Sequence, residues 1–451
     1  MRAVTMGEKG CGLVADALLE RWEPTSSDRF DLRKAGHLMR RAALGGSLAE
    51  RQRMVSLGVD RAMKMVSGGS EGGVDAAFER TLALGSIDSA RAYRVWRMLR
   101  GRRRLAEVMS FFWHGHFATS NQKVTSPRMM SRQLRLFDRL GMGRFDELML
   151  AVSRDPAMIL WLDNDTNVKG RANENFAREL FELFTLGRGN YTERDIREAA
   201  RAFTGWQQRD ETFRFVRGFH DAGEKTVFGK RGKFGGEEII AMTVRRPDSA
   251  RFLAAKLLAF FVHPEPTQAE INAVAVVYEK SGREIGVTVE TILRSRLFFS
   301  ERAYRSRLKS PADLAIGLVR SLGATVSPQA IASAMGVMGQ ALLEPPTVEG
   351  WRGEQEWITS ATWLLRSNFA ADLFAGRRNY NMKPVAESLL EKAKTPKERA
   401  DLVLHLLFDG HVSDESRQAM LDFADSSAAR GAGGAGAMLH AAMTFPEAQL
   451  L

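Results

Sequence analysis

The sequence NENFARELFELFTLGRGNYTERDIREAARAFTG, residues 173–205, decides the fold more than any other stretch. Its first half places Phe176, Leu180 and Phe184 at helical spacing, so these side chains form one apolar stripe. The connection LGRGNY follows, and Thr192 with Asp195 has the spacing of a capping box, which marks the start of a second helix. One face of that helix carries small and apolar residues, namely Ile196, Ala199, Ala200 and Phe203. The stretch therefore predicts an antiparallel helical hairpin, which is a rigid platform for polar side chains.

Helical periodicity continues on both sides of this hairpin. Asp31, and Ser47 with Glu50, have the types and spacing of helix-capping residues. Alternation of apolar and polar residues is rare, except at 212–219, where phenylalanines recur at every second position. Residues 226–228 could pair with that strand across the turn HDAGEK. We therefore predict an all-α protein, a large single helical domain with a short inserted β-hairpin. The helical patterns lie at 84–113, 130–153, 173–186, 193–204, 248–262, 267–281, 288–299, 311–322, 328–340, 360–375 and 396–407.

We expect four segments along the chain. Residues 1–30 form an N-terminal extension, and the helical domain covers 31–426. The Ala/Gly-rich stretch 427–437, SAARGAGGAGA, is typical of a flexible connector. The last segment, 438–451, carries enough apolar residues to dock back on the body of the protein.

The composition excludes several classes of protein. The chain has 451 residues, of which 44% are hydrophobic and 26% charged, and this balance is typical of a globular protein rather than a disordered one. Cys11 is the only cysteine, which excludes an internal disulfide and a zinc site built from several thiolates. No run reaches the roughly 18 to 20 apolar residues of a membrane-spanning helix, and the N-terminus lacks the hydrophobic core of a signal peptide. We therefore expect the chain as written to stay in the cytoplasm.

The chain carries a net charge of +11, and its densest basic segment is rich in arginine. A solvated helix face is the ordinary interpretation of such a run. Arginines on one face could instead neutralise phosphates, which would make the protein a binder of anions or nucleic acid. The run lacks an aromatic ladder or a nucleic-acid motif, so we rank nucleic acid lowest among the partners. Its members are Arg91, Arg94, Arg97, Arg100, Arg102, Arg103 and Arg104.

His114 and His116 lie in the aromatic segment FFWHGHF, residues 111–117. Two residues apart on a helix, their side chains would point about 200° apart, but Gly115 favours a helix end at this position. Beyond a helix end, the chain could turn both imidazoles toward one metal ion, because neutral imidazole is the commonest biological metal ligand. The alternative is a structural role, since the helix dipole favours a histidine in the last turn of a helix.

Glu179 and Glu182 are three residues apart, so their carboxylates are neighbours on one ridge of the first helix of the hairpin. Such a pair can bind a divalent cation or divide acid and base roles, because proximity separates the two pKa values. We assign Asn173 and Arg178, on the same element, to substrate binding. The alternative is an exposed surface on which Arg178 forms ordinary ion pairs with Glu174 and Glu182.

A third candidate group is His220, Asp221 and Lys225, at the tip of the predicted β-hairpin. A histidine beside an aspartate can be a base, an acid or a ligand, and Lys225 could hold an anionic substrate group. The group could equally be turn chemistry, in which Asp221 binds its own backbone. A fourth feature is the loop EPPTVEGW, 344–351, whose Trp351 could line a substrate cleft or serve in packing.

These features occur together, in this order, in a known bacterial family. The chain resembles the family catalogued as domain of unknown function 1800, and the resemblance extends from about residue 30 to the C-terminus. It departs from the family at Gly115, where relatives commonly carry asparagine, and in lacking the export signal that members often have. The family has no established activity. The resemblance implies a cell-envelope location and a neighbouring partner, a sulfatase-like protein of the family domain of unknown function 1501. The matching stretches are 36–42, 112–117, 173–180, 184–187, 200–206, 219–221, 345–346 and 350–351.

We derive two main hypotheses for function. The first is a metal-dependent, hydrolase-like enzyme in which Glu179, Glu182, His220 and Asp221 are catalytic and His114 and His116 bind a divalent ion. Zinc, manganese or iron would suit these ligands, and the ion would activate water or polarise a substrate oxygen. The alternative is a non-enzymatic partner or assembly factor for the sulfatase-like protein, in which the same motifs hold the fold together.

Overall fold

The structure, a computed structural model, describes residues 18–69, 74–377, 385–431 and 433–451. The chain divides into two compact units, and we describe each by itself. The sequence pattern predicts one helical domain over 31–426, because no linker composition marks the places where the chain passes from one unit to the other. Unit 1 comprises the described residues up to Trp22, Met109–Ala303 and Leu343–Trp351, and unit 2 comprises Glu23–Val108, Tyr304–Leu342 and Arg352–Leu451.

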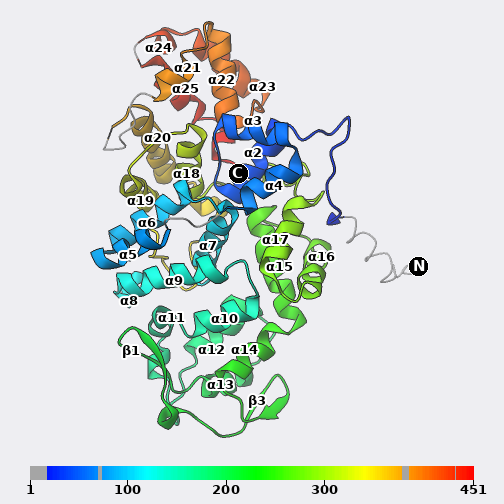
Figure 1. Cartoon of the computed structure of the whole chain (residues 1–451), viewed down its shortest axis with the longest axis vertical. Helices are drawn as coiled ribbons and strands as arrows, with labels where there is room; N and C mark the ends of the chain where they lie inside the picture. Colours follow the sequence, from blue (N-terminus) through cyan, green and yellow to red (C-terminus); the bar gives the residue numbers. More distant parts are fainter. Residues whose placement is uncertain (1–17, 70–73, 378–384, 432) are drawn as a thin grey trace, which may run out of the picture. The chain divides into compact units, whose positions relative to one another are not determined.

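Unit 1 is mainly helical (Figure 1), and three short turns, η1 (Asn164–Thr166), the π-helical η2 (Leu180–Thr185) and η3 (Arg217–Phe219), interrupt its helices. Helix α7 (Arg104–His116) belongs to unit 1 from Met109 onward. The other helices of unit 1 are α8 (Asn121–Val124), α9 (Pro127–Leu140), α10 (Phe145–Ser153), α11 (Pro156–Trp161), α12 (Asn175–Glu179), α13 (Glu193–Ala202), α14 (Gly236–Val244), α15 (Pro247–Phe261), α16 (Gln268–Lys280) and α17 (Ile285–Arg294).

The core of unit 1 is built around the aromatic end of α7. Trp113 is fully buried, and its ring stacks on Phe117 at 5.5 Å and on Phe145 at 5.8 Å between centroids. Phe117 stacks in turn on Phe137 at 5.7 Å. The Trp113 indole N–H donates to the carbonyl of Gly141 at 2.7 Å, so the polar end of this large side chain is satisfied inside the core. This packing fixes α7, α9 and α10 around the histidines that follow Trp113.

Two short antiparallel hairpins replace the single hairpin of the sequence analysis. Strand β1 (Trp206–Arg209) pairs with β2 (Thr212–Phe215), and β3 (Lys225–Val227) pairs with β4 (Lys230–Gly232). The predicted pairing of 212–219 with 226–228 is therefore wrong. Each hairpin closes through two residues of positive φ, at 210–211 and 228–229, as a primed turn requires. Hairpin β1–β2 packs on α11 and strand β3 packs on α13 (Figure 1).

Unit 2 is also helical, and the described part of the chain thus confirms the all-α prediction. The pattern at 84–113 is not one helix, because α6 ends with Gly101 as its C-cap. The helices of unit 2 are α2 (Leu32–Ala43), α3 (Leu48–Leu57), α4 (Val59–Ser67), α5 (Val74–Leu84), α6 (Ile87–Arg100), α7 up to Val108, α18 (Pro311–Ser321), α19 (Pro328–Val337), η4 (Glu354–Trp357), α20 (Ser360–Phe374), α21 (Val385–Leu390), α22 (Pro396–Phe408), α23 (Asp414–Ala424), α24 (Ser427–Arg430), α25 (Gly434–Ala442) and η5 (Pro446–Gln449).

Part of the arginine-rich run is not solvated, although Arg100 and Arg102 are exposed. Arg94 and Arg97 are only 1% and 2% exposed, and both bind the carboxylate of Glu107 on α7. Arg94 Nη1 lies 3.0 Å from one carboxylate oxygen and Arg97 Nε lies 2.8 Å from the other. The chain turns at Gly101, so that Glu107 faces α6. Glu107 is thirteen residues from Arg94 and ten from Arg97 in sequence, and its contact with them removes the two guanidinium groups from water.

A second buried carboxylate in unit 2, Asp409, also binds two arginines. Arg40 lies 2.5 Å from one of its oxygens, and Arg51 binds the other oxygen and two backbone carbonyls of α22. Burial alone would raise the pKa of Asp409, but the charges of Arg40 and Arg51 hold that pKa below its usual value. Gly36 on α2 leaves the space for this carboxylate, since a Cβ there would lie 2.0 Å from an Asp409 oxygen.

The Ala/Gly-rich stretch 427–437, which we interpreted as a flexible connector, is largely helical. It contains α24 and the start of α25. Alanine is the best helix former, and its frequency here offsets the cost of the glycines. After α25 the chain packs inside unit 2, where the Lys309 ammonium donates to the Ala448 carbonyl at 2.8 Å and Arg366 donates to the Gln449 side chain at 2.9 Å.

In the part of the chain that the structure describes, no helix has both the length and the apolar character needed to cross a bilayer.

We expect Glu107→Gln to destabilise unit 2 by about 3 kcal/mol, because it removes the negative charge that two buried guanidinium groups share. The midpoint of urea unfolding, followed by tryptophan fluorescence and circular dichroism, measures this loss. Glu79→Gln is the matched control, since Glu79 is an exposed residue of α5. Equal midpoints for the two variants would contradict the importance that we give to the Glu107 pair.

Candidate functional site

The candidate site lies where α12 passes into the π-helical turn η2. Phe176, Leu180 and Phe184 are buried in unit 1, as their spacing predicts. The opposite side of the same run carries Glu179 and Glu182, both partly exposed. A π-helical turn inside a helix is frequently found at functional sites. The sequence analysis missed this turn, because the apolar pattern of a π-turn differs little from that of an α-helix over so few residues.

Glu182 is held as a carboxylate by two neighbours. The Arg188 guanidinium donates to one oxygen at 2.5 Å, and the Tyr191 hydroxyl donates to the other at 2.8 Å. Partial burial alone would raise the pKa of Glu182, but these two hydrogen bonds outweigh it and hold that pKa below its usual range. Burial, together with the charge of Glu182, raises the pKa of Tyr191 to about 12, so the phenol remains a donor.

Glu179 has the opposite environment. Among the residues that the structure describes, its carboxyl group forms no hydrogen bond and no ion pair. Burial, followed by repulsion from the negative charge of Glu182, raises the pKa of Glu179. Two carboxyl groups three residues apart are therefore driven toward different protonation states, and such a pair is the arrangement that divides acid and base roles.

Three further side chains belong to the same electrostatic neighbourhood in unit 1. Glu349, in the loop before Trp351, lies 3.3 Å from Arg188, and its charge also raises the pKa of Glu179. Burial lowers the pKa of Lys256 on α15, although Glu349 acts against it. Burial, and then the charge of Lys256, lowers the pKa of His116 to about 3, so His116 is a neutral imidazole.

The two histidines are not directed at one ion. Helix α7 continues through His114 and Gly115 and ends at His116, so the helix end expected at Gly115 does not separate the two residues. His114 is 1% exposed, and its Nε2 accepts the Leu343 N–H at 3.0 Å. The Nε2 of His116 lies 3.1 Å from the Phe184 carbonyl, to which it donates. Each ring thus uses a nitrogen in a separate backbone contact.

The residues present do not fit the expected metal ion. No group of three or more His, Cys, Asp or Glu side chains is placed to hold one within the described ranges 18–69, 74–377, 385–431 and 433–451. Cys11 falls outside those ranges. His114 and His116 are two residues apart on α7, and a helix directs such side chains to different sides. The geometry therefore gives no support to a metal-binding role for this pair.

The residues assigned to substrate binding are engaged within the protein. Arg178 binds Glu174 at 3.1 Å, as the ion-pair alternative expects, and both oxygens of Glu193 at 2.9 and 2.8 Å, which it does not. The expected pair with Glu182 does not form, because Glu182 binds Arg188. The Asn173 amide donates to the Thr166 hydroxyl at 3.1 Å, and its backbone N–H donates to the buried Asn167 side chain at 2.9 Å. The Trp351 indole contacts His114 edge-on at 5.2 Å between ring centroids. These contacts fix the fold locally and leave the substrate-binding roles as predictions.

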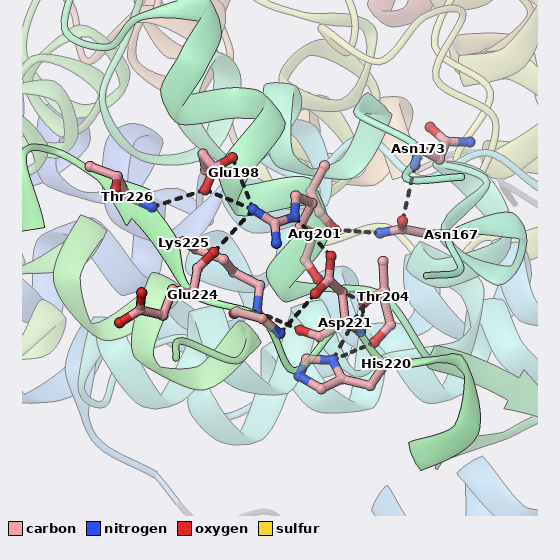
Figure 2. Close-up of polar contacts among 12 residues, drawn as sticks. Asn167, Asn173, Glu198, Arg201, Thr204, His220, Asp221, Glu224, Lys225 and Thr226 are labelled. Carbon is pink, nitrogen blue, oxygen red and sulfur yellow. Dashed lines mark hydrogen bonds and ion pairs between the residues drawn. The ribbon is translucent and has the colours of Figure 1, made fainter. Parts of the chain in front are cut away.

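His220 and Asp221 lie between the two hairpins and Lys225 is the first residue of β3, so none is at a hairpin tip. Arg201 of α13 organises this group (Figure 2). Arg201 Nε lies 2.8 Å from Asp221, and its Nη1 binds both oxygens of Glu198 at 3.1 and 3.0 Å. The Arg201 hydrogen bond holds the pKa of Asp221 near 2. Lys225 is 1% exposed and donates to the Asp221 carbonyl at 2.5 Å. This network attaches the segment between the hairpins to α13.

His220 contacts Thr204, which lies just beyond the end of α13. Its Nδ1 lies 3.0 Å from the Thr204 carbonyl and therefore carries the proton, which leaves Nε2 as the acceptor nitrogen (Figure 2). The Thr204 hydroxyl accepts the Asp221 N–H at 2.8 Å. No hydrogen bond or ion pair in the described part of unit 1 joins His220 or Asp221 to Glu179 or Glu182.

The four residues predicted as catalytic thus fall into two groups. Glu179 and Glu182 form one, and His220 with Asp221 forms the other. The sequence analysis did not assign roles to Arg188, Arg201 or Lys256, which control the charges of these groups. The spacing of Glu198 and Arg201, three residues apart on one helix, was the available signal for the second group. Arg188 and Lys256 gave none, because a loop and a distant helix bring them to the site.

The fold defines a class, the mainly helical proteins, and the run of α12 and η2 in this one carries two neighbouring acidic residues. The chain belongs to the family described as Protein of unknown function (DUF1800), whose model matches residues 37–450. The match covers nearly the whole chain and confirms the resemblance stated from the motifs. No curated protein and no solved structure matches the chain.

We expect Arg201→Gln to loosen the segment between the hairpins, at a cost of roughly 1 kcal/mol once partial exposure of the ion pair is taken into account. Faster amide hydrogen exchange at 221–232 measures the effect. Arg197→Gln, at an exposed position of the same helix, is the matched control and should leave exchange unchanged.

The same segment should respond to acid. The pKa of Asp221 is about 2, below the ordinary value of about 3.9, so its ion pair stabilises the folded state above roughly pH 4. That contribution is lost as the pH falls toward 2. Protection of 221–232 that is unchanged from pH 5 to pH 2 in the wild type would contradict the assignment.

Proposed function

We propose that the chain is a hydrolase-like enzyme that uses Glu179 as its proton-transferring group and Glu182 to set the pKa of Glu179. The observation that supports this function is the contrast between the two carboxyl groups. Glu182 is saturated by Arg188 and Tyr191, whereas Glu179 has no partner among the described residues and a raised pKa. Perturbed carboxyl groups of this kind cluster at active sites.

The chemistry that follows is general acid–base hydrolysis. Protonated Glu179 gives its proton to the leaving-group oxygen while water attacks the electrophilic atom, and the Glu179 carboxylate recovers a proton from that water. Glu182 acts through Glu179, because its fixed negative charge disfavours ionisation of the neighbour. Lys256, which lies near Glu349 and His116, supplies a positive charge on this side of unit 1 that suits an anionic substrate.

This mechanism does not require the divalent ion of the original hypothesis, whose expected ligands are not brought together. The metal-dependent version remains open to a direct test. We expect protein purified without added metal to hold much less than one equivalent of any transition metal, and to gain no activity from zinc, manganese or iron. One equivalent of tightly bound metal would favour the metal-dependent enzyme.

A panel of nitrophenyl acetate, phosphate, sulfate and glycosides tests the proposed reaction. We expect Glu179→Gln to lower kcat by about 10²- to 10⁴-fold, as removal of a general acid does. Glu147→Gln, at an exposed position of α10, is the control and should be unaffected. Activity should fall as the pH rises through the raised pKa of Glu179, since the protonated form is the active one. Unchanged turnover in Glu179→Gln would exclude this role.

A second measurement does not depend on knowing the substrate. Glu182→Gln removes the neighbouring negative charge, so the pKa of Glu179 should fall. Carboxyl ¹³C chemical shifts of labelled glutamate, followed against pH in the wild type and in this variant, measure that change. A Glu179 pKa that does not move would show that the two carboxyl groups are not coupled.

The second candidate function is the non-enzymatic partner or assembly factor for the sulfatase-like protein of the family domain of unknown function 1501. The observation that favours it is that Arg178 and Arg201 each form ion pairs with two acidic residues inside the protein. These side chains are therefore engaged in holding the fold together. Two phenylalanines of unit 1, Phe215 and Phe219, are 48% and 42% exposed and could contact a partner. Comigration of the two purified proteins in size-exclusion chromatography, with no turnover of the substrate panel, would support this function over the enzyme.

A further inference from the structure

Unit 2 contains a pocket that is lined by both charged and apolar residues. These residues are far in sequence from Glu179 and Glu182. Its volume is about 620 Å³, within the range of small-molecule sites. Residues of α3, α6, the start of α7, α18 and the start of α19 line it. Arg100 and Gly323 at its edge are exposed, so solvent reaches it.

Three of the lining side chains are arginines, and one is a carboxylate. Arg100, Arg104 and Arg320 face the pocket together with Glu50. Glu50 is committed to Arg104, which binds it directly. Burial alone would raise the pKa of Glu50, but the hydrogen bond from Arg104 lowers it, so the two groups form a neutral pair. The remaining two guanidinium groups give the lining a net positive charge.

Arg320 is the side chain that most needs an anion. Its Nη1 donates to the Met98 carbonyl at 3.1 Å, and no carboxylate pairs with it within the residues that the structure describes. Burial, followed by repulsion from Arg104, lowers the pKa of Arg320 to about 10, although the charge of Glu50 acts against this shift. Arg320 therefore stays protonated near neutral pH. Arg100 has one side-chain contact in the same described residues, to the Thr325 hydroxyl at 3.3 Å. Other arginines of unit 2, such as Arg51 and Arg94, bind a carboxylate directly, whereas Arg320 forms no ion pair in the described residues.

Apart from Ser47, the rest of the lining is apolar or glycine. Trp96 and Leu99 of α6, Val319 of α18 and Val326 and Pro328 before and within α19 form this part of the wall. An apolar wall beside two arginines that form no ion pair within the described residues suits a ligand that combines an anionic group with an apolar body. The apolar wall also limits the space for a polymer. Because Arg94 and Arg97 are buried, α6 lacks the continuous basic face that a nucleic-acid backbone would follow.

We propose that this pocket binds a small anionic molecule with an apolar body, a phosphate ester or a carboxylate, whose anionic group pairs with Arg320 and Arg100. Guanidinium groups match the geometry of both oxyanions and form charge-assisted hydrogen bonds with them. The site is independent of the proposed enzyme, because it lies in the other unit and shares no residue with the carboxyl pair. Either proposal can fail without the other.

Calorimetric titration of the full chain at low salt tests the site with four probes: phenyl phosphate, benzoate, inorganic phosphate and phenol. We expect saturable binding of phenyl phosphate or benzoate, weaker binding of inorganic phosphate, and none of phenol. The first two probes distinguish a phosphate ligand from a carboxylate ligand. Added salt should weaken binding, since an ion pair at the pocket is partly screened.

Arg320→Gln should weaken binding of the better probe by about tenfold or more, the usual effect of losing a charge-assisted hydrogen bond. Arg53→Gln, at an exposed position of α3, is the matched control and should bind as the wild type does. If Arg320→Gln does not fold, Arg100→Gln serves in its place. Glu50→Gln should strengthen binding, because it removes the only negative charge from the lining while keeping an acceptor for the helix cap.

Three results would overturn the proposal. The first is the absence of saturable binding of any anionic probe to the wild type. The second is unchanged binding in Arg320→Gln or Arg100→Gln, which would place the anion elsewhere. The third is tighter, Arg320-dependent binding of a single-stranded oligonucleotide than of phenyl phosphate, which would make the pocket part of a nucleic-acid surface. Equal affinities for inorganic phosphate and phenyl phosphate would show that the apolar part of the ligand does not contribute to binding.

Discussion

The fold depends on hydrogen-bond acceptors for the guanidinium groups that it buries away from water. Arg94 and Arg97 share the carboxylate of Glu107, and two arginines of α2 and α3 share Asp409. A buried cation without such a partner is strongly destabilising, because desolvation removes several kcal/mol of hydration that only a close counter-charge can offset. Helices that are far apart in sequence are therefore held in register by single carboxylates, in addition to their apolar packing.

The same constraint shows which residues do not serve the fold. In unit 1, Arg201 meets Glu198 and Asp221 and attaches the segment between the hairpins to α13. Against this background, Glu179 is a partly buried carboxyl group that forms no ion pair, and Arg320 is a pocket cation that Glu50 attracts without forming an ion pair, within the residues described. In the two proposals above, a bound substrate or ligand supplies the missing partner of each group.

Much of the fold could be predicted from the sequence, because the relevant interactions are local. The capping boxes at Ser47 and Thr192 form as their spacing indicates, and Asp31 caps α2. The candidate carboxyl pair was found for the same reason, since residues three apart are neighbours on a helix. The hairpin pairing was wrong because the turn at 210–211 uses two non-glycine residues with positive φ, which turn preferences do not anticipate.

The sequence by itself determined the helical class, the helix starts and the family, since each depends on residue types at short and fixed spacings. Only the tertiary structure decided which charged groups are paired. It buried Arg94 and Arg97 against Glu107, placed His114 and His116 in separate backbone contacts, and left Glu179 without a partner in the part of the chain described. The physical reason is that the charge state and reactivity of a side chain depend on its neighbours in space, and those neighbours arrive from distant segments.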